Sequence, residues 1–153
     1  MRIREMGPSD LDGVMAIEEV SFPTPWSRRM FLEDFPRDFS DTLVATGAGD
    51  EVLGYAVCWT IAGESHLLNI AVHPERRGQG IGRALLSECI RRAARAGASV
   101  IFLEVRAGNE AAQRLYRSMG FAFRGIRKGY YADTGGEDAV ILDREVRKSD
   151  ATG

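Results

Sequence analysis

The segment Ile70–Leu86 constrains the fold of this chain more than any other part of the sequence. An apolar, strand-like run ends at Val72, a polar turn containing proline follows, and three alternate glycines then lead into an amphipathic helix. Backbone N–H groups at a helix start have no partner within the helix, and the helix dipole adds positive charge there. This order of parts predicts a cradle for a phosphate-like anion, to which Arg76, Arg77 and Arg83 can add side-chain charge.

Three kinds of phosphate-binding loop compete for this segment. A Walker loop would end in Gly-Lys-Ser/Thr, which is missing here. A dinucleotide-binding turn would show G-x-G-x-x-G, but the third glycine position falls on Arg83 or Leu85 in the two frames. The pattern that matches is R-x-x-G-x-G, at Arg77, Gly80 and Gly82. A simple glycine-rich turn that opens a helix is the alternative.

Hydrophobic patterning predicts one α+β domain. We expect strands over 2–6, 42–46, 52–61, 66–72, 100–105, 121–127 and 139–145, and helices over 11–18, 28–35, 81–96 and 110–119. Strands that come first, followed by strand–helix units, indicate a mixed, mostly antiparallel sheet of about seven strands with about four helices on its two faces. Residues 1–147 form the expected domain, and residues 148–153 form an expected flexible tail.

Composition excludes several classes of protein. The length of 153 residues suits one domain with a substantial core, and a net charge of −2 gives no broad basic field for nucleic acid. The chain has no apolar run of about eighteen residues and no signal-like start, which predicts a cytoplasmic protein without a membrane contact. Cys58 and Cys89 are expected to be buried thiols. Neither they nor His66 and His73 have metal-ligand spacing, so we expect no metal.

Three further segments support a family resemblance. They are Phe102–Asn109 followed by Leu115-Tyr116 and Gly120-Phe121, Phe22–Ser27 with two extra residues before PWS, and Arg127–Ile141. With the R-x-x-G-x-G loop, these segments resemble the GNAT family of N-acetyltransferases over about residues 1–146, and most closely its ribosomal-protein-alanine N-acetyltransferase branch (RimI type). The resemblance implies a GNAT-type fold, acetyl-coenzyme A (acetyl-CoA) as cosubstrate, and direct acetyl transfer to the N-terminal α-amine of a protein, in that branch a ribosomal protein.

The resemblance also implies a set of acetyl-CoA-binding residues. The set comprises the backbone of Ile70, Ala71 and Val72 along the pantetheine arm, the pyrophosphate loop Arg77, Gly78, Gln79, Gly80, Ile81, Gly82 and Arg83, and Asn109 and Tyr116 towards the thioester. A core strand and a helix cap are compatible with these roles, because the strand contacts use backbone atoms and one asparagine can serve both purposes.

Glu104 is the candidate base, acting through a water as the resemblance implies. It is an acid in an otherwise apolar strand, where burial would raise its pKa. The alternatives are an ion pair with Arg106 or another arginine, simple exposure at the end of the strand, or proton transfer by His66 or Glu64 instead. Tyr116 is the candidate acid for the sulfur of coenzyme A, and a core aromatic is its alternative role.

The substrate groove is expected to contain Trp26, Asn69, Tyr130 and Tyr131. Loop aromatics of this kind also serve as packing lids. An α-amine, with a pKa of about 7.7–8.0, is roughly 10% neutral at pH 7, whereas a lysine amine at about 10.4 is neutral only about 0.04% of the time. One carboxylate base therefore favours an N-terminal amine.

Two other functions remain open from the sequence. The first is acetylation of lysine side chains or small-molecule amines, and the second is a non-catalytic acyl-CoA-binding sensor. A monomer or weak dimer is expected. Arg91, Arg92 and Arg95 are expected to form a solvated helix face, with a ribosomal RNA contact as the alternative.

Overall fold

A computed structural model describes residues 1–152 and contains seven strands and four α-helices over that range. The strands are β1 (Arg2–Glu5), β2 (Ser40–Thr46), β3 (Val52–Ile61), β4 (Glu64–Val72), β5 (Val100–Arg106), β6 (Ala122–Tyr131) and β7 (Glu137–Glu145). The helices are α1 (Leu11–Ser21), α2 (Arg28–Asp34), α3 (Ile81–Arg95) and α4 (Glu110–Ser118), and short 3-10 helices cover Pro8–Asp10, Pro74–Arg76, Ala132–Thr134 and Lys148–Ala151. The predicted fold class is confirmed. Within residues 1–152, no helix has the length and apolar character needed to cross a bilayer.

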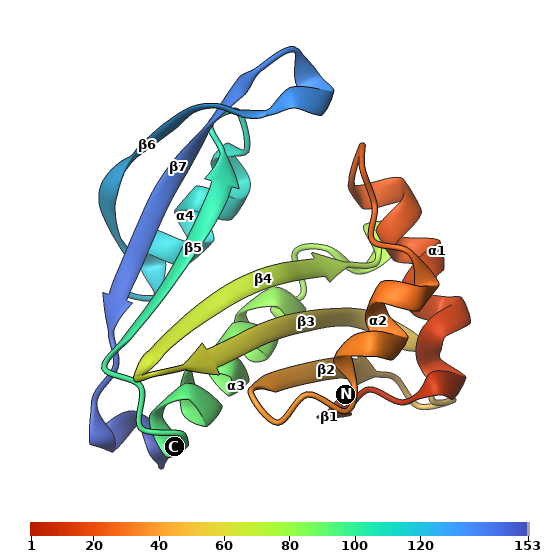
Figure 1. Ribbon diagram of the computed structural model, residues 1–153. Helices are drawn as coiled ribbons and strands as arrows, with labels where there is room; N and C mark the ends of the chain where they lie inside the picture. Colours follow the sequence, from red (N-terminus) through yellow and green to blue (C-terminus); the bar gives the residue numbers. More distant parts are fainter. Residues whose placement is uncertain (153) are drawn as a thin grey trace.

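All seven strands form one sheet in the order β1-β2-β3-β4-β5-β7-β6 over the described residues. Every neighbouring pair is antiparallel except β4 and β5, which run parallel. Figure 1 shows α1 and α2 on one face of the first four strands, with α3 and α4 behind the sheet. The figure also shows β4 and β5 diverging from a common end. The sheet therefore opens in its middle, between its two halves.

Two hydrophobic cores cover the two faces of the sheet. One includes Leu85 and Cys89 of α3 with Leu103 of β5, and the other includes Ile17 of α1 with Phe31 of α2. Alternate side chains of a strand point to opposite faces, and β2, β3 and β4 supply buried residues to both cores. Both cysteine thiols are buried, as the sequence predicts.

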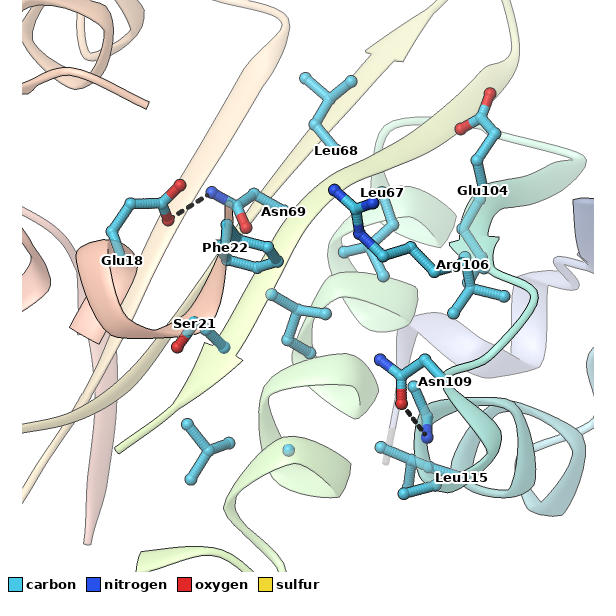
Figure 2. A pocket seen from close by; sticks show the side chains of 18 of the residues that line it. Glu18, Ser21, Phe22, Leu67, Leu68, Asn69, Glu104, Arg106, Asn109 and Leu115 are labelled. Carbon is cyan, nitrogen blue, oxygen red and sulfur yellow. Dashed lines mark hydrogen bonds between the residues drawn. The ribbon is translucent and has the colours of Figure 1, made fainter. Parts of the chain in front are cut away.

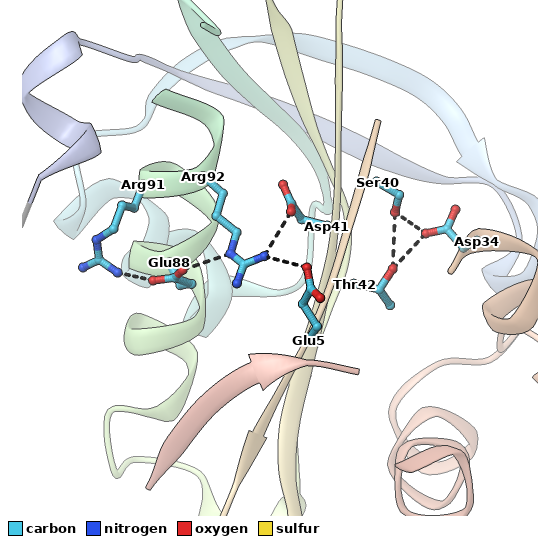
Figure 3. Close-up of polar contacts among 8 residues, drawn as sticks. All are labelled: Glu5, Asp34, Ser40, Asp41, Thr42, Glu88, Arg91 and Arg92. Carbon is cyan, nitrogen blue, oxygen red and sulfur yellow. Dashed lines mark hydrogen bonds and ion pairs between the residues drawn. The ribbon is translucent and has the colours of Figure 1, made fainter. Parts of the chain in front are cut away.

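Of the three arginines expected on a solvated face of α3, Arg95 is exposed, whereas Arg91 and Arg92 form ion pairs within the protein. Arg92 donates to Glu88 (2.9 Å), to Asp41 on β2 (3.2 Å) and to Glu5 on β1 (3.4 Å), and Arg91 also pairs with Glu88 (Figure 3). The Arg92 guanidinium therefore connects α3 to β1 and β2.

A second polar cluster joins α2 to the opposite face of β2. Asp34 is fully buried and accepts hydrogen bonds from Ser40, from Thr42 (3.2 Å) and from the indole of Trp59 (3.0 Å), and Figure 3 shows the two hydroxyl contacts. Arg37 also donates to Asp34 at 3.1 Å, and these four donors balance the cost of burying the carboxylate.

The C-terminal segment, for which the sequence predicts a flexible tail, contacts the rest of the domain. Lys148–Ala151 forms a 3-10 turn in which the Asp150 carboxylate accepts from the Arg147 amide (2.8 Å) and pairs with Arg144 of β7 (3.1 Å). Arg95 of α3 donates to the Ala151 carbonyl at 3.3 Å. These contacts fix the turn against α3 and β7, and the last predicted tail residue, Gly153, lies outside the described residues.

Candidate active site

The divergence of β4 from β5 creates the candidate site. The two strands pair only from Glu64↔Val100 to His66↔Phe102. The register between β3 and β4 then shifts, so that Leu68 is an extra residue on β4. Such a bulge bends a strand and increases its twist. The second half of β4 consequently turns away from β5.

A cavity of about 710 Å³ occupies this opening. It brings together eleven of the predicted site residues: Trp26, Asn69, Ile70, Ala71, Val72, Arg77, Gly82, Glu104, Asn109, Tyr116 and Tyr131. Figure 2 shows Glu18 and Asn69 on the side of α1 and β4, with Glu104, Arg106 and Asn109 on the side of β5 and α4. Residues separated by up to about a hundred positions in the sequence thus face one space.

The loop of residues 77–83, the glycine loop, lies at one end of this cavity and leads into α3. Gly78 and Gly80 have φ angles of 78° and 83°, and no atom lies within 4 Å of where their Cβ atoms would be. The first intrahelical bond runs from the Ala84 amide to the Gly80 carbonyl, so the preceding amides of the first turn point out of the helix. The loop therefore presents backbone donors in open space, as the sequence predicts for an anion cradle.

The arginines of the loop have separate contacts. Arg77 lines the cavity and its Nε lies 3.4 Å from the Val72 carbonyl, whereas Arg83 donates to Ser118 of α4 at 2.7 Å. Arg76 pairs with Glu51 at 3.4 Å. The cavity lining does not include Gly78, Gln79, Gly80, Ile81 or Arg83, and Ile81 is instead buried in the α3 core.

Glu104 projects from β5 into the cavity with only 9% of its side chain exposed. Its Oε2 lies 2.6 Å from Nε2 of His66, and its Oε1 lies 3.7 Å from Nε of Arg127. The hydrogen bond with His66 lowers the pKa of Glu104 and outweighs the opposing effect of burial. The expected rise in pKa is therefore wrong, because sequence alone did not reveal this partner.

Arg106 does not pair with Glu104, which was one of the alternatives. It donates two hydrogen bonds to Asp133 (2.9 and 3.0 Å), and its guanidinium lies 4.0 Å from the ring centre of Tyr131. Thr24 donates to the same Asp133 at 2.9 Å. The loop after α1 and the β6–β7 connection are thereby joined across one end of the cavity.

The two predicted groove tyrosines have different environments. Tyr131 lines the cavity, and burial raises its pKa to about 12. Tyr130 packs edge-on against Tyr131 with the ring centres 5.0 Å apart, but it is exposed and is not among the lining residues.

Tyr116 and Asn109 reach the cavity from α4. Tyr116 is only 6% exposed, and burial raises the pKa of its phenol well above the usual value. Its ring also packs against Phe121, with ring centres 5.8 Å apart. The Asn109 side chain accepts from the Ala112 amide at 3.2 Å, so it caps the helix as the sequence predicts.

Glu18 is a site residue that sequence reasoning missed. Its buried carboxylate accepts hydrogen bonds from the Tyr55 hydroxyl (2.5 Å), the Asn69 amide (2.8 Å) and the backbone N–H of Trp26 (2.8 Å). The available signal was an acid at an apolar-face position of a helix. Ser21 also lines the cavity, and its hydroxyl oxygen is buried without a hydrogen-bond partner within residues 1–152.

The comparisons with known proteins agree with this geometry. Residues 11–121 match the model of the acetyltransferase (GNAT) family. The [ribosomal protein bS18]-alanine N-acetyltransferase of Escherichia coli (strain K12) is 35% identical over 92% of this chain and 94% of its own length. The chain belongs to the GNAT acetyltransferase family.

Two solved structures support the same assignment. The ribosomal-protein-S18-alanine N-acetyltransferase of Escherichia coli has a TM-score of 0.85 at 35% identity and covers 95% of this chain and 93% of its own. The ribosomal-protein-alanine N-acetyltransferase of Brucella melitensis has a TM-score of 0.83 at 29% identity and covers 95% of this chain and 99% of its own. The family resemblance noted in the sequence is confirmed, and the protein is an N-acetyltransferase.

Proposed function

We propose that this protein transfers the acetyl group of acetyl-CoA to the N-terminal α-amine of a protein, with a ribosomal protein as the first candidate. The similarity to the relatives above supports the substrate class, and a ribosomal substrate would make the cytoplasm the place of action. The observation that carries the proposal is that Glu104 of β5 and Tyr116 of α4 line one cavity beside the glycine loop. An acid and a base thus share the space in which an amine and a thioester would meet.

Acetyl-CoA, which the GNAT family uses, fits the residues of the loop end. The open space over Gly78 and Gly80 lets a phosphate approach the first-turn amides of α3. Arg77 adds positive charge, and the edge of β4 left without a β5 partner offers backbone groups to an amide-containing arm. When bound, acetyl-CoA supplies an acetyl thioester: the amine nitrogen forms a bond to the carbonyl carbon, and the carbon–sulfur bond breaks.

Glu104 takes the proton that the amine loses. Its lowered pKa keeps it ionised at neutral pH, so it is ready to accept. A carboxylate of low pKa is nevertheless a weak base, and general bases work best when their pKa lies near the working pH. An α-amine suits this base better than a lysine amine does, because it is neutral more often.

Tyr116 gives a proton to the leaving thiolate. Burial raises the pKa of its phenol, so the hydroxyl keeps its proton until a strong base forms beside it. The tyrosine and the carboxylate together return the site to its starting state once they exchange protons with solvent.

A peptide panel tests this function. The purified protein is incubated with acetyl-CoA and ribosomal-protein N-terminal peptides, each paired with an N-terminally blocked twin that contains lysine, and mass spectrometry with fragmentation locates the acetyl group. We expect acetyl on α-amines only, strongest on one ribosomal terminus. Acetyl on lysines only would overturn the substrate class. Binding of acetyl-CoA without transfer to any peptide would indicate a small-molecule substrate or a sensor.

A further inference from the structure

In contact with Glu104, but not among the residues that line the cavity, lies a histidine to which the proposed function gives no role. His66 Nε2 is 2.6 Å from Glu104 Oε2, and the imidazole stacks on Phe102 with ring centres 4.3 Å apart and planes inclined by 13°. His66 and Phe102 form the last pair before β4 and β5 separate. The imidazole is therefore held by a paired part of the sheet, where its position relative to the carboxylate is well defined.

The protonation state of this pair follows from the chemistry of its members. An ionised carboxylate can only accept hydrogen bonds. Since Glu104 is ionised at neutral pH, the short contact requires a hydrogen on Nε2 of His66. Neutral His66 is therefore the Nε2–H tautomer.

Other charged or titratable groups near the pair come from the elements around it. They are Glu64 on β4, Arg106 on β5, Arg124, Arg127 and Tyr131 on β6, Asp143 on β7, Asp133 in the β6–β7 connection, and Arg37, whose guanidinium lies over the ring of Trp59 on β3. Most have a partner of their own: Asp143 pairs with Arg124, Arg106 with Asp133, and Arg37 with Asp34. Arg127 Nε lies 3.7 Å from Glu104 Oε1, whereas Nε2 of His66 lies within hydrogen-bond distance of Oε2.

We propose that His66 is a positioning residue of the acetyl-transfer site: its Nε2–H holds Oε2 of Glu104 and leaves Oε1 to take the amine proton. This inference rests on the proposed function. In the productive state, the proton moves from the amine nitrogen to Oε1, directly or through a water, while His66 keeps its hydrogen bond to Oε2.

Two substitutions test the hydrogen bond that His66 donates to Glu104. His66→Gln keeps an amide N–H that can reach Oε2, whereas His66→Leu removes the donor. At pH 8.5, we expect kcat of His66→Gln to stay within about threefold of wild type and kcat of His66→Leu to fall about tenfold or more. Full activity of His66→Leu, or a loss for His66→Gln as large as that for His66→Leu, would overturn the inference.

A second measurement does not depend on activity. The chain has two histidines, so a long-range proton–nitrogen NMR spectrum of labelled protein contains two imidazoles, and His73→Gln assigns them. His73 serves as an internal reference, because its Nδ1 accepts from the Glu75 amide (3.1 Å) and its neutral form must also carry the proton on Nε2. We expect the Nε2–H tautomer for His66 at pH 8. An Nδ1–H tautomer would overturn the inference even for an active enzyme. The expected tautomer in a protein that acetylates no peptide would keep the pair and refute the proposed function instead.

Discussion

The two ends of the cavity are built in different ways. The end proposed for coenzyme A is a continuous stretch of chain, residues 77–83, which offers backbone amides at the start of α3. The end proposed for the amine is assembled from side chains of α1, β4, β5 and the β6–β7 connection. A phosphate-binding site made of backbone donors depends little on the identity of its side chains, so it can serve a whole family. The side chains at the amine end can be replaced individually. Differences in substrate between family members should therefore arise at the amine end.

The largest effect should come from the base. Glu104→Gln removes the proton acceptor while it preserves shape, and general-base catalysis typically contributes about 10²–10⁴-fold, so we expect kcat to fall by at least about 10²-fold. Calorimetry should give an unchanged affinity for coenzyme A, because that ligand is bound at the other end. Full rate across the pH range would show that Glu104 takes no part in the reaction. A parallel loss of coenzyme A affinity would mean that the two ends of the cavity are not separate.

Tyr116→Phe tests the proposed acid, which lies where the two ends of the cavity meet. The ring still packs against Phe121, so the fold should persist, but the hydroxyl that protonates the thiolate is gone. We expect turnover to fall about 10²-fold, the low end of the acid–base range. Initial rates at saturating peptide, with thermal unfolding as the check on folding, give the answer. An unchanged rate would mean that Tyr116 has a purely structural role in the core.

The same contrast explains what the sequence could predict. The loop of Arg77, Gly80 and Gly82 was recognisable because spacing along the chain determines its backbone geometry. The sheet and its helices followed from local periodicity. The partners of Glu104 did not, because its contact with His66 depends on the register between β4 and β5. This missing partner reversed the expected direction of the pKa shift.

Glu18 and the C-terminal turn show the same limit. Glu18 lies at an apolar-face position of α1, yet its three donors come from segments that only the fold brings together. Asp150 of the C-terminal turn pairs with Arg144 on β7. Local patterns thus missed charged side chains whose partners lie in other segments of the fold.

Gly80→Val tests the loop end. A residue with a Cβ atom in the left-handed region costs about 1–2 kcal/mol, so the loop should relax and turn its amides away from the phosphate. We expect the Kd for coenzyme A, measured by calorimetry, to rise about tenfold. Gly63→Val is the matched control, because Gly63 has a φ of 82° with no atom within 4 Å of its Cβ position, but lies in the β3–β4 turn. If both variants weaken binding equally, the loop has no special role.

Tyr55→Phe should have the smallest effect, and it tests the buried hydrogen bonds of Glu18 that support the amine end. The substitution removes the hydrogen bond to Glu18, and it leaves the donors from Asn69 and Trp26 in place. A buried hydrogen bond to a charged group contributes about 1.5–3 kcal/mol, which chemical denaturation would detect. Because Glu18 holds the backbone beside Trp26, we also expect KM for the peptide to rise about threefold while kcat and coenzyme A affinity stay constant. Tyr130→Phe, at an exposed ring, is the control for loss of a hydroxyl and should not alter stability. A rise in KM for coenzyme A instead of peptide would show that the buried network supports the whole cavity and that its two ends are not independent.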